Sequence, residues 1–315
     1  MRHSVKVFAP ASVANVAVGY DILGFALEKP GDDILVREGK EPGLKIVEIT
    51  GAQGKLPFDP KKNTAGFSAL RLMEHVEEKH APIEMVIHKK MAFGSGMGSS
   101  AASAVAGVFA VNEYLKTGLT KREILRFAVE GEQIADGAFH ADNIAPSLLG
   151  GMILIRDNES LDIKKLHIPH GIHIAVIHPH VEVLTRDSRG VLADSVPLNK
   201  VITQSGNLAA FVAAMYTSDI DLLSRCIQDV IIEPQRAQLI PHFYTLKKMA
   251  LAEGALGFSI SGAGPAMFAM CANSLVAENV VAGAQRFLSD HNIKNTSFTS
   301  LIIMKEQLNI NYLYP

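Results

Sequence analysis

The feature that most constrains this chain is a glycine-rich run at residues 94–102, Gly-Ser-Gly-Met-Gly-Ser-Ser-Ala-Ala, in which three alternate glycines precede small, helix-forming residues. Glycine permits positive φ and close approach of a ligand, so that successive amide N–H groups can point at one anion. Residues 99–116 are predicted to form a helix whose N-terminal amides and dipole face this loop. The run therefore predicts an anion site, and phosphate is the expected ligand.

The two common nucleotide-binding loops do not match this run. A Walker loop has Lys followed by Ser or Thr after its last glycine, whereas Ser99 and Ser100 follow Gly98. A dinucleotide-binding fingerprint has an acidic residue at the end of the next strand, whereas Glu113, at about that separation, lies inside the predicted helix. Taken alone, the run favours a simpler interpretation, a turn that lets a helix pack closely on a strand.

Composition and charge exclude several classes of protein. Hydrophobic residues make up 48% of the 315 residues and charged residues 20%, which indicates a folded globular protein with a sizeable core. The formal net charge is −2 and the basic residues are scattered, so no nucleic-acid partner is expected. The apolar stretch at 104–111 is too short to cross a membrane, and the first residues lack the apolar core of a signal peptide. Two cysteines without motif spacing fit the same prediction, a cytoplasmic protein.

Hydrophobic periodicity predicts strands and helices without a regular repeat, which indicates an α+β fold. Strands are expected at 5–8, 33–37, 44–49, 83–87, 152–155, 172–178, 257–261, 266–271 and 296–303. Helices are expected at 63–79, 99–116, 121–136, 199–215, 220–227, 241–253 and 273–290. Thr120 is the expected N-cap of the third helix and Gly137 its stop. A polar turn at 157–159 predicts a boundary between two domains, residues 1–158 and 159–315.

Two further segments change the interpretation of the glycine-rich run. Residues 9–27 read Ala-Pro-Ala-Ser-Val-Ala-Asn-Val-Ala-Val-Gly-Tyr-Asp-Ile-Leu-Gly-Phe-Ala-Leu, and residues 259–266 read Ser-Ile-Ser-Gly-Ala-Gly-Pro-Ala. In this order and spacing, the three segments resemble the three signature motifs of the GHMP small-molecule kinases, across almost the whole chain. The resemblance implies a two-domain GHMP kinase fold: a ribosomal-protein-S5-like, ATP-binding N-terminal domain, a ferredoxin-like C-terminal domain, and an active site between them.

Within this family the resemblance narrows to the homoserine kinases. Residues 9–27 are similar to the pattern P-A-T-S-A-N-L-G-x-G-F-D-x-L-G, with departures at Ser12, Val13, Val16, Ala17 and Tyr20. Mevalonate kinase and galactokinase carry a lysine at the place of Ser12. Residues 132–146 resemble the homoserine kinase segment in which a glutamate on a helix is followed by H-x-D-N. In this segment, Asn143 stands where mevalonate kinase has its proposed catalytic aspartate. The implied reaction is ATP-dependent phosphorylation of the hydroxyl group of L-homoserine to O-phospho-L-homoserine, in threonine biosynthesis.

The resemblance also implies the site residues. Ser100 and Glu132 are expected to hold Mg²⁺, a hard cation that takes oxygen ligands beside substrate phosphates, and Asn143 completes the catalytic set. The ATP-binding residues are expected to be Asn63, Gly94, Ser95, Gly96, Met97, Gly98, Ser99, Ser100 and Gly262. The homoserine-binding residues are expected to be Asn15, Asp21, His140, Asp142, Asn143, Thr185, Arg189 and Arg236. The aspartate carboxylates would bind the ammonium group of the substrate, and the arginine guanidinium groups would bind its carboxylate.

Several residues keep a second interpretation. Asn63 is equally typical of a helix N-cap, and Arg186 could be confused with Arg189 in the T-x-x-x-R segment. Lys89 and Lys90 precede the glycine-rich run, but paired lysines are usually solvated, so the predicted site omits them. Histidines crowd residues 167–180 and invite a metal site, although alternation at 172–177 favours a strand with flanking turns.

Two other functions stay open at this stage. A different GHMP kinase would act on a sugar or isoprenoid alcohol, and a nucleotide-binding regulator would have the fold without turnover. Because an amide cannot accept a proton at neutral pH, Asn143 predicts phosphoryl transfer without a dedicated side-chain base. The sequence leaves the oligomeric state open, and a homodimer is compatible with it.

Overall fold

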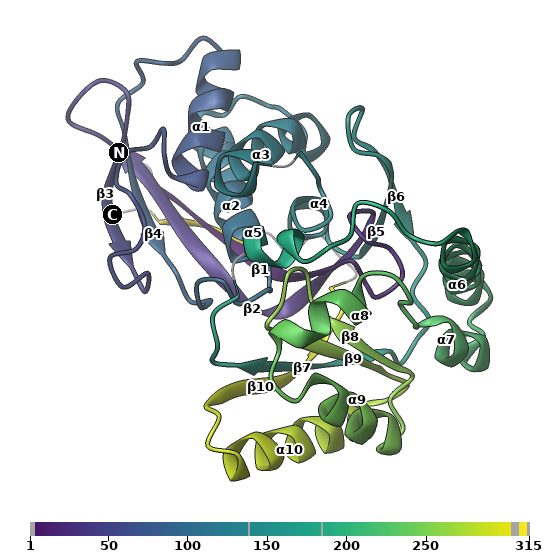
Figure 1. Ribbon diagram of the computed structural model, residues 1–315. Coiled ribbons are helices and arrows are strands. Elements are labelled where there is room, and N and C mark those ends of the chain that lie inside the picture. The colour runs from purple at the N-terminus through teal and green to yellow at the C-terminus, as the bar shows by residue number, and fades with distance from the viewer. Residues whose placement is uncertain (1–3, 138, 184, 304–308, 314–315) are drawn as a thin grey trace.

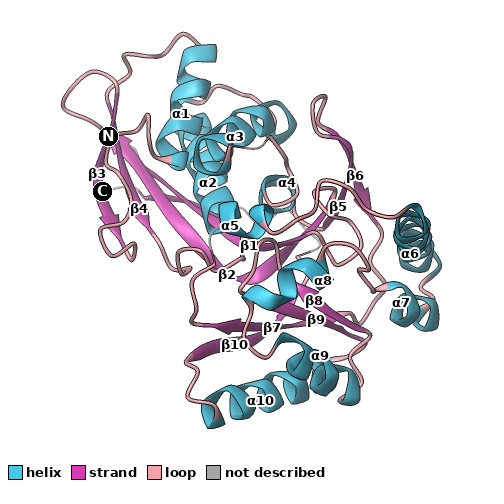
Figure 2. Cartoon of the chain, in the orientation of Figure 1, coloured by secondary structure: helices cyan, strands magenta, loops and turns pink. Residues whose placement is uncertain are grey.

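The computed structural model describes residues 4–137, 139–183, 185–303 and 309–313, and Figure 1 shows their arrangement. The described chain forms two separate sheets, each with helices packed against it (Figure 2). The α+β class predicted from the hydrophobic pattern is confirmed.

The first sheet follows the order β11-β1-β2-β4-β3; β5 pairs with β2, and β6 pairs with β5. Its strands are β1 (Ser4–Ala14), β2 (Leu23–Glu38), β3 (Leu44–Thr50), β4 (Ile83–His88), β5 (Met152–Asp157), β6 (Asp162–Leu166) and β11 (Asn309–Leu313). The long strand β2 pairs with three other strands: with β1 along most of its length, with β4 through its second half and with β5 through its first residues.

Four helices accompany this sheet: α1 (Thr64–His75), α2 (Ser99–Leu115), α3 (Lys121–Asp136) and α4 (Ile144–Leu149). The alanine-rich α2 contacts β1, β2, α1 and α3, and it is buried on nearly all sides, as expected of a helix that is apolar all round. A Cβ atom at Gly107 would lie 2.4 Å from the carbonyl oxygen of Ala65, so this glycine lets α2 pack against α1. None of the described helices combines the length and apolar character needed to cross a membrane.

Both predicted ends of α3 agree with the structure, whereas α1 ends earlier than predicted. α3 begins after Thr120, which forms a capping box with Glu123, and stops at Gly137 in the left-handed conformation. α1 begins after Asn63 but ends at His75 rather than at residue 79. It ends early because Glu77 adopts a φ of 61°, which is incompatible with continuing a right-handed helix.

The second sheet is antiparallel, with the order β10-β7-β9-β8. Its strands are β7 (His173–Pro179), β8 (Gly257–Ile260), β9 (Met267–Cys271) and β10 (Asn295–Leu301). Helix α10 (Ser274–Asp290) packs on β7, β9 and β10, and α9 (Phe243–Ala252) packs beside it (Figure 1). The other helices of this half are α5 (Thr185–Gly190), α6 (Leu198–Thr217), α7 (Ile220–Cys226), α8 (Glu233–Arg236) and the 3₁₀ helix η1 (Ala237–Leu239).

The two sheets do not divide the chain at a single point. β6 and β11 both follow residue 158, yet β6 pairs with β5 and β11 pairs with β1 in the first sheet. The division into domains 1–158 and 159–315 remains a prediction about folding units, and these two strands cross it.

The sheets contact each other near the start of β2, at residues 25–27. The ring of Phe25 packs edge-on against Phe268 of β9, with ring centroids 5.8 Å apart. The amide of Ile303 donates to the carbonyl oxygen of Ala26 at 3.0 Å, just beyond β10. This junction brings loops from both halves of the chain to one place.

Candidate active site

A cavity of about 570 Å³ lies where those loops meet. The three motif segments are far apart in sequence, but all contribute to its wall: Asn15 and Asp21 from the first, 94–96 and 98–100 from the second, and 262–264 from the third. Glu132 from α3 and Arg236 from α8 complete it. Convergence of the three segments is the arrangement that the sequence resemblance implies.

With two exceptions, every predicted site residue lines this cavity. The exceptions are Met97 and Thr185. The side chain of Met97 is buried in the core, and its carbonyl oxygen accepts from the Ser12 amide at 3.1 Å. The side chain of Thr185 lies outside the described residues.

The glycine-rich loop has the geometry expected of an anion site. Gly94, Gly96 and Gly98 all have positive φ, between 64° and 76°. Helix α2 starts directly after Gly98, and no side chain caps its N-terminus. Because the first-turn amides of a long helix then have no side-chain partner and carry the positive end of its dipole, this loop suits a phosphate group.

Groups from the third motif segment, residues 259–266, hold the glycine-rich loop in place. The Ser261 hydroxyl donates to the carbonyl oxygen of Gly96 at 2.7 Å, and the Ala266 amide donates to that of Ser95 at 3.0 Å. A Cβ atom at Gly96 would lie 2.7 Å from the carbonyl oxygens of Ser261 and Gly264. Gly96 is therefore required by close packing as well as by backbone conformation.

Under the loop lies a buried ion pair that the sequence analysis did not find. Lys89 is bonded to Asp32, and the two side chains are only 6% and 0% exposed. Lys89 Nζ also donates to the Ser99 carbonyl oxygen at 2.7 Å and to Ser103 Oγ at 2.6 Å. Burial lowers the pKa of Lys89, while the neighbouring Asp32 and Glu132 carboxylates oppose that shift.

Asp32 binds the chain on both sides of the loop. Its carboxylate accepts from the amides of Lys90 and Met91, at 2.7 and 3.1 Å, and from Ser99 Oγ at 3.1 Å. The prediction that both lysines are solvated is therefore wrong for Lys89, although Lys90 is exposed and pairs with Asp33. The sequence feature that could have indicated this ion pair is Asp32–Asp33, two acidic residues at the start of a predicted strand. Carboxylates buried in a sheet need cationic partners.

Tyr20 lies between two arginines of the cavity wall. Its hydroxyl oxygen accepts from Arg189 at 2.8 Å and from Arg236 at 3.1 Å. Arg189 also forms a two-bond salt bridge with Asp21, at 3.0 and 3.1 Å. Arg236 is 3% exposed and donates to the carbonyl oxygens of Ser188 and Gly262, at 2.9 and 3.1 Å. Burial raises the pKa of Tyr20, so its hydroxyl stays protonated at neutral pH.

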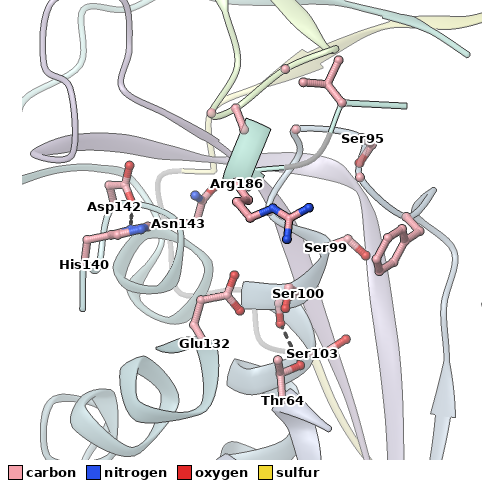
Figure 3. A pocket seen from close by; sticks show the side chains of 18 of the residues that line it. Thr64, Ser95, Ser99, Ser100, Ser103, Glu132, His140, Asp142, Asn143 and Arg186 are labelled. Atoms are coloured by element: carbon pink, nitrogen blue, oxygen red, sulfur yellow. Dashed lines mark hydrogen bonds and ion pairs between the residues drawn. The ribbon is translucent and has the colours of Figure 1, made fainter. Parts of the chain in front are cut away.

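The H-x-D-N segment lines the same cavity, and Figure 3 shows His140, Asp142 and Asn143 close together in its wall. A ring nitrogen of His140 is 2.8 Å from Asp142, whose side chain is buried. Ligand atoms of Asp21, His140 and Asp142 all lie within 4.8 Å of one another. Asn143 Oδ1 accepts a 2.8 Å hydrogen bond from Ser12 Oγ, which orients the amide group.

Glu132 and Ser100 face one part of the cavity from α3 and α2 (Figure 3). Carboxylate and hydroxyl oxygens beside an anion-binding loop are the ligand types that Mg²⁺ takes. The residues present therefore fit the predicted cation.

Two alternatives left open by the sequence can be compared with the structure. Asn63 is the N-cap of α1: its side chain accepts from the amides of Ala65 and Gly66 and donates to Pro57. It also lines the cavity, so its predicted contact with ATP stays a prediction. The histidines of 167–180 do not come together as a metal group among the described residues, and 173–179 form β7.

Comparison with known proteins identifies relatives along nearly the whole chain. Residues 65–151 match the model of the GHMP kinases N terminal domain, and residues 211–290 match that of the GHMP kinases C terminal domain. A homoserine kinase from Chlorobaculum tepidum is 42% identical over 90% of both chains, and one from Chlorobium phaeobacteroides is 41% identical over 95% of this chain and 97% of its own.

Solved structures agree with these relatives. The crystal structure of homoserine kinase from Cytophaga hutchinsonii superposes with a TM-score of 0.94 and 43% identity, covering 98% of this chain and 97% of that chain. L. major mevalonate kinase, solved with R-mevalonate, has a TM-score of 0.70 at 16% identity, covering 94% of this chain and 96% of that chain, which shows a shared fold only.

Proposed function

The chain belongs to the homoserine kinases of the GHMP kinase family, as its sequence predicts, and from this premise we propose how its cavity transfers the γ-phosphoryl group of ATP to the hydroxyl group of L-homoserine. The GHMP kinase fold predicted from the sequence is likewise confirmed. The observation that carries the mechanism is one cavity that joins an uncapped glycine-rich helix start to a cluster of paired charges.

The paired charges suit a zwitterionic amino acid. Asp21 and Arg189 neutralise each other in this structure, and Asp142 and Arg236 lie in the same cavity wall. We propose that the ammonium group of the substrate binds at Asp21 and Asp142, and that its carboxylate binds at Arg189 and Arg236. A zwitterion can exchange opposite charges with this cluster without leaving a buried charge unpaired, whereas a neutral sugar cannot.

Tyr20 is the group that orients the two arginines, so removing its hydroxyl tests this arrangement. Tyr20→Phe is expected to raise KM for L-homoserine about 5- to 10-fold and to leave kcat within about 2-fold, because the lost acceptor loosens substrate binding rather than chemistry. Steady-state kinetics at saturating ATP measure both constants. Tyr244→Phe makes the same change at an exposed tyrosine and should be neutral. An unchanged KM in Tyr20→Phe would refute this role.

The phosphate end is proposed to use the amides at the start of α2, with Glu132 and Ser100 as ligands of Mg²⁺. When bound, Mg²⁺ would neutralise negative charge on the β- and γ-phosphates. Lys89 and Asp32 hold the loop at both ends, so the amides need no rearrangement as charge develops.

In the transfer step, the hydroxyl oxygen of homoserine forms a bond to the γ-phosphorus. The bond from the γ-phosphorus to its bridging oxygen breaks, and that electron pair leaves with ADP. The hydroxyl proton passes to a phosphate oxygen or to water, because Asn143 cannot accept it and its Oδ1 is already bonded to Ser12. The Asn143 N–H groups are left to donate to the reacting oxygens, so this residue positions rather than deprotonates the substrate.

A substrate panel tests the proposed function. L-Homoserine is expected to exceed mevalonate, galactose and shikimate in kcat/KM by about 1,000-fold or more, because a neutral or singly charged analogue leaves charges unpaired in the cavity. ADP release is measured with a coupled assay. L-2-Aminobutyrate keeps both charges but lacks the hydroxyl group, so it should inhibit without being phosphorylated.

Two results would contradict the proposal. Turnover of galactose at the rate of homoserine would show a sugar kinase. Binding of ATP with no ADP release for any alcohol would show a regulator that keeps the fold without turnover.

A further inference from the structure

We propose that Arg186 is a catalytic residue whose guanidinium contacts the γ-phosphoryl group during transfer and neutralises its charge. This inference rests on the proposed function, since it concerns the same reaction. Figure 3 shows the Arg186 side chain pointing into the cavity, toward Ser99 and Ser100 at the start of α2 and above Glu132. These are the groups proposed to hold the phosphates and their metal ion.

The other cations of the cavity are engaged elsewhere. Among the described residues, five lysine and arginine side chains line it. Three of them have buried or charged partners: Lys89 with Asp32, Arg189 with Asp21, and Arg236 with backbone carbonyls and Tyr20. The remaining two are Lys62 and Arg186, and Lys62 belongs to the loop before α1. Arg186 therefore supplies an adjustable positive charge that faces the glycine-rich loop.

The Arg186 side chain makes only a weak ion pair in this structure, so little interaction energy is lost when it turns to contact a bound phosphate. Its side chain is 89% exposed, and its ion pair with Asp187 has a distance of 3.8 Å. In water such a charge is largely screened. When ATP and substrate fill the cavity and displace that water, the same guanidinium acts more strongly on developing phosphoryl charge.

Helix α5 carries both Arg186 and Arg189, a residue of the proposed substrate site. Arg186 and Arg189 are three residues apart, so they lie on the same side of the helix. Arg189 is anchored to Asp21 and Tyr20 at the substrate end, which directs Arg186 toward the phosphate end. One short helix thus spans the donor and the acceptor of the phosphoryl group.

The chemical role follows from the balance of charge in the step. As the hydroxyl oxygen bonds to the γ-phosphorus and the bridging oxygen departs with its electron pair on ADP, negative charge spreads over the equatorial oxygens. A planar guanidinium can donate two parallel N–H bonds to two of these oxygens, which a lysine ammonium cannot do in the same geometry. The hydroxyl proton goes to a phosphate oxygen or water, as before.

The test compares Arg186→Ala and Arg186→Lys with the unaltered enzyme at saturating ATP and homoserine. Arg186→Ala is expected to lower kcat about 100-fold with KM for homoserine changed less than about 3-fold, and Arg186→Lys is expected to recover only a small part. Added guanidinium chloride, at concentrations that do not unfold the protein, should raise kcat of Arg186→Ala severalfold but not that of Arg186→Lys. Thermal unfolding checks that both variants fold.

Two controls separate a specific contact from a general electrostatic effect. Lys62→Met removes another cation of the cavity, and it should alter KM for ATP rather than kcat. Arg286→Ala removes an exposed arginine of α10, far from the cavity, and should leave both constants unchanged.

Three outcomes would overturn the assignment. They are a normal kcat in Arg186→Ala, a defect confined to KM for homoserine, and a loss of kcat that lysine restores in full. Failure of the unaltered enzyme to phosphorylate homoserine would instead refute the proposed function, so the two failures are distinguishable.

Discussion

Replacing Glu132 by glutamine is expected to lower kcat by about three orders of magnitude while the protein stays folded. The substitution keeps the size of the side chain but removes the negative charge that we propose holds Mg²⁺ beside Ser100. A metal-stabilised transition state loses several kcal/mol when its ion is lost, and each 1.36 kcal/mol is a factor of about ten in rate.

The measurement has two readouts. Binding of Mn²⁺ in the presence of a non-hydrolysable ATP analogue, followed by electron paramagnetic resonance, should weaken at least 10-fold in Glu132→Gln. The dependence of kcat on Mg²⁺ concentration should shift in the same direction. Near-normal activity of Glu132→Gln at limiting Mg²⁺ would show that another group holds the ion.

Glu130 provides a matched control on the same helix. It pairs with Arg71 and Arg126 rather than lining the cavity, so Glu130→Gln removes an equal charge at a position outside the proposed metal site. Its kcat and Mn²⁺ affinity should stay within about 2-fold of the unaltered enzyme. The free energy of unfolding should fall by about 1 kcal/mol or less, because partly exposed ion pairs contribute little.

Gly98→Ala is expected to abolish measurable kinase activity and to destabilise the fold. A Cβ atom at this position would lie 2.2 Å from Ser12 Oγ and 2.7 Å from Asn143 Oδ1, closer than any real contact. Either the glycine-rich loop moves or the Ser12–Asn143 hydrogen bond breaks, and both changes misplace groups proposed to orient the phosphates and the substrate. The positive φ of 65° adds roughly 1–2 kcal/mol of strain for alanine.

Gly118→Ala separates these two causes. Gly118 has a similar φ, 75°, but a Cβ atom there meets nothing within 4 Å. Both variants should lose stability from backbone strain, measured by chemical unfolding, whereas only Gly98→Ala should also lose activity. If Gly118→Ala loses as much activity as Gly98→Ala, the close approach at Ser12 and Asn143 is not the reason for the glycine.

Local patterns in the sequence predicted those elements whose ends are set by neighbouring residues. Thr120, Glu123 and Gly137 mark α3 because a capping box and a left-handed stop involve residues within one turn of the helix end. The alternation of Ile83, Met85 and Ile87 predicted β4, because side chains alternate between the two faces of a strand.

Elements whose formation depends on distant partners were missed. β6 and β11 are short strands that join the first sheet only through pairing with β5 and β1. The first half of β2 was missed because Pro30 and Gly31 are typical of a turn, yet in the structure this strand continues through them and pairs with β1 on both sides. Helices α4 and α5 are six residues each, too short for a clear period.

The resemblance of the motif segments to those of the homoserine kinases identified the family and the reaction from the sequence alone. The glycine-rich loop was predicted from the residues themselves, because glycine at alternate positions before a helix has a direct backbone consequence. Only the tertiary structure decided which charged side chains meet. Lys89 bonds to Asp32, which is 57 residues away in sequence, and Arg236 bonds to Tyr20, which is 216 residues away. A lysine or arginine looks the same in sequence whether solvated or buried, and its role is fixed by the partner that the fold brings within hydrogen-bonding distance.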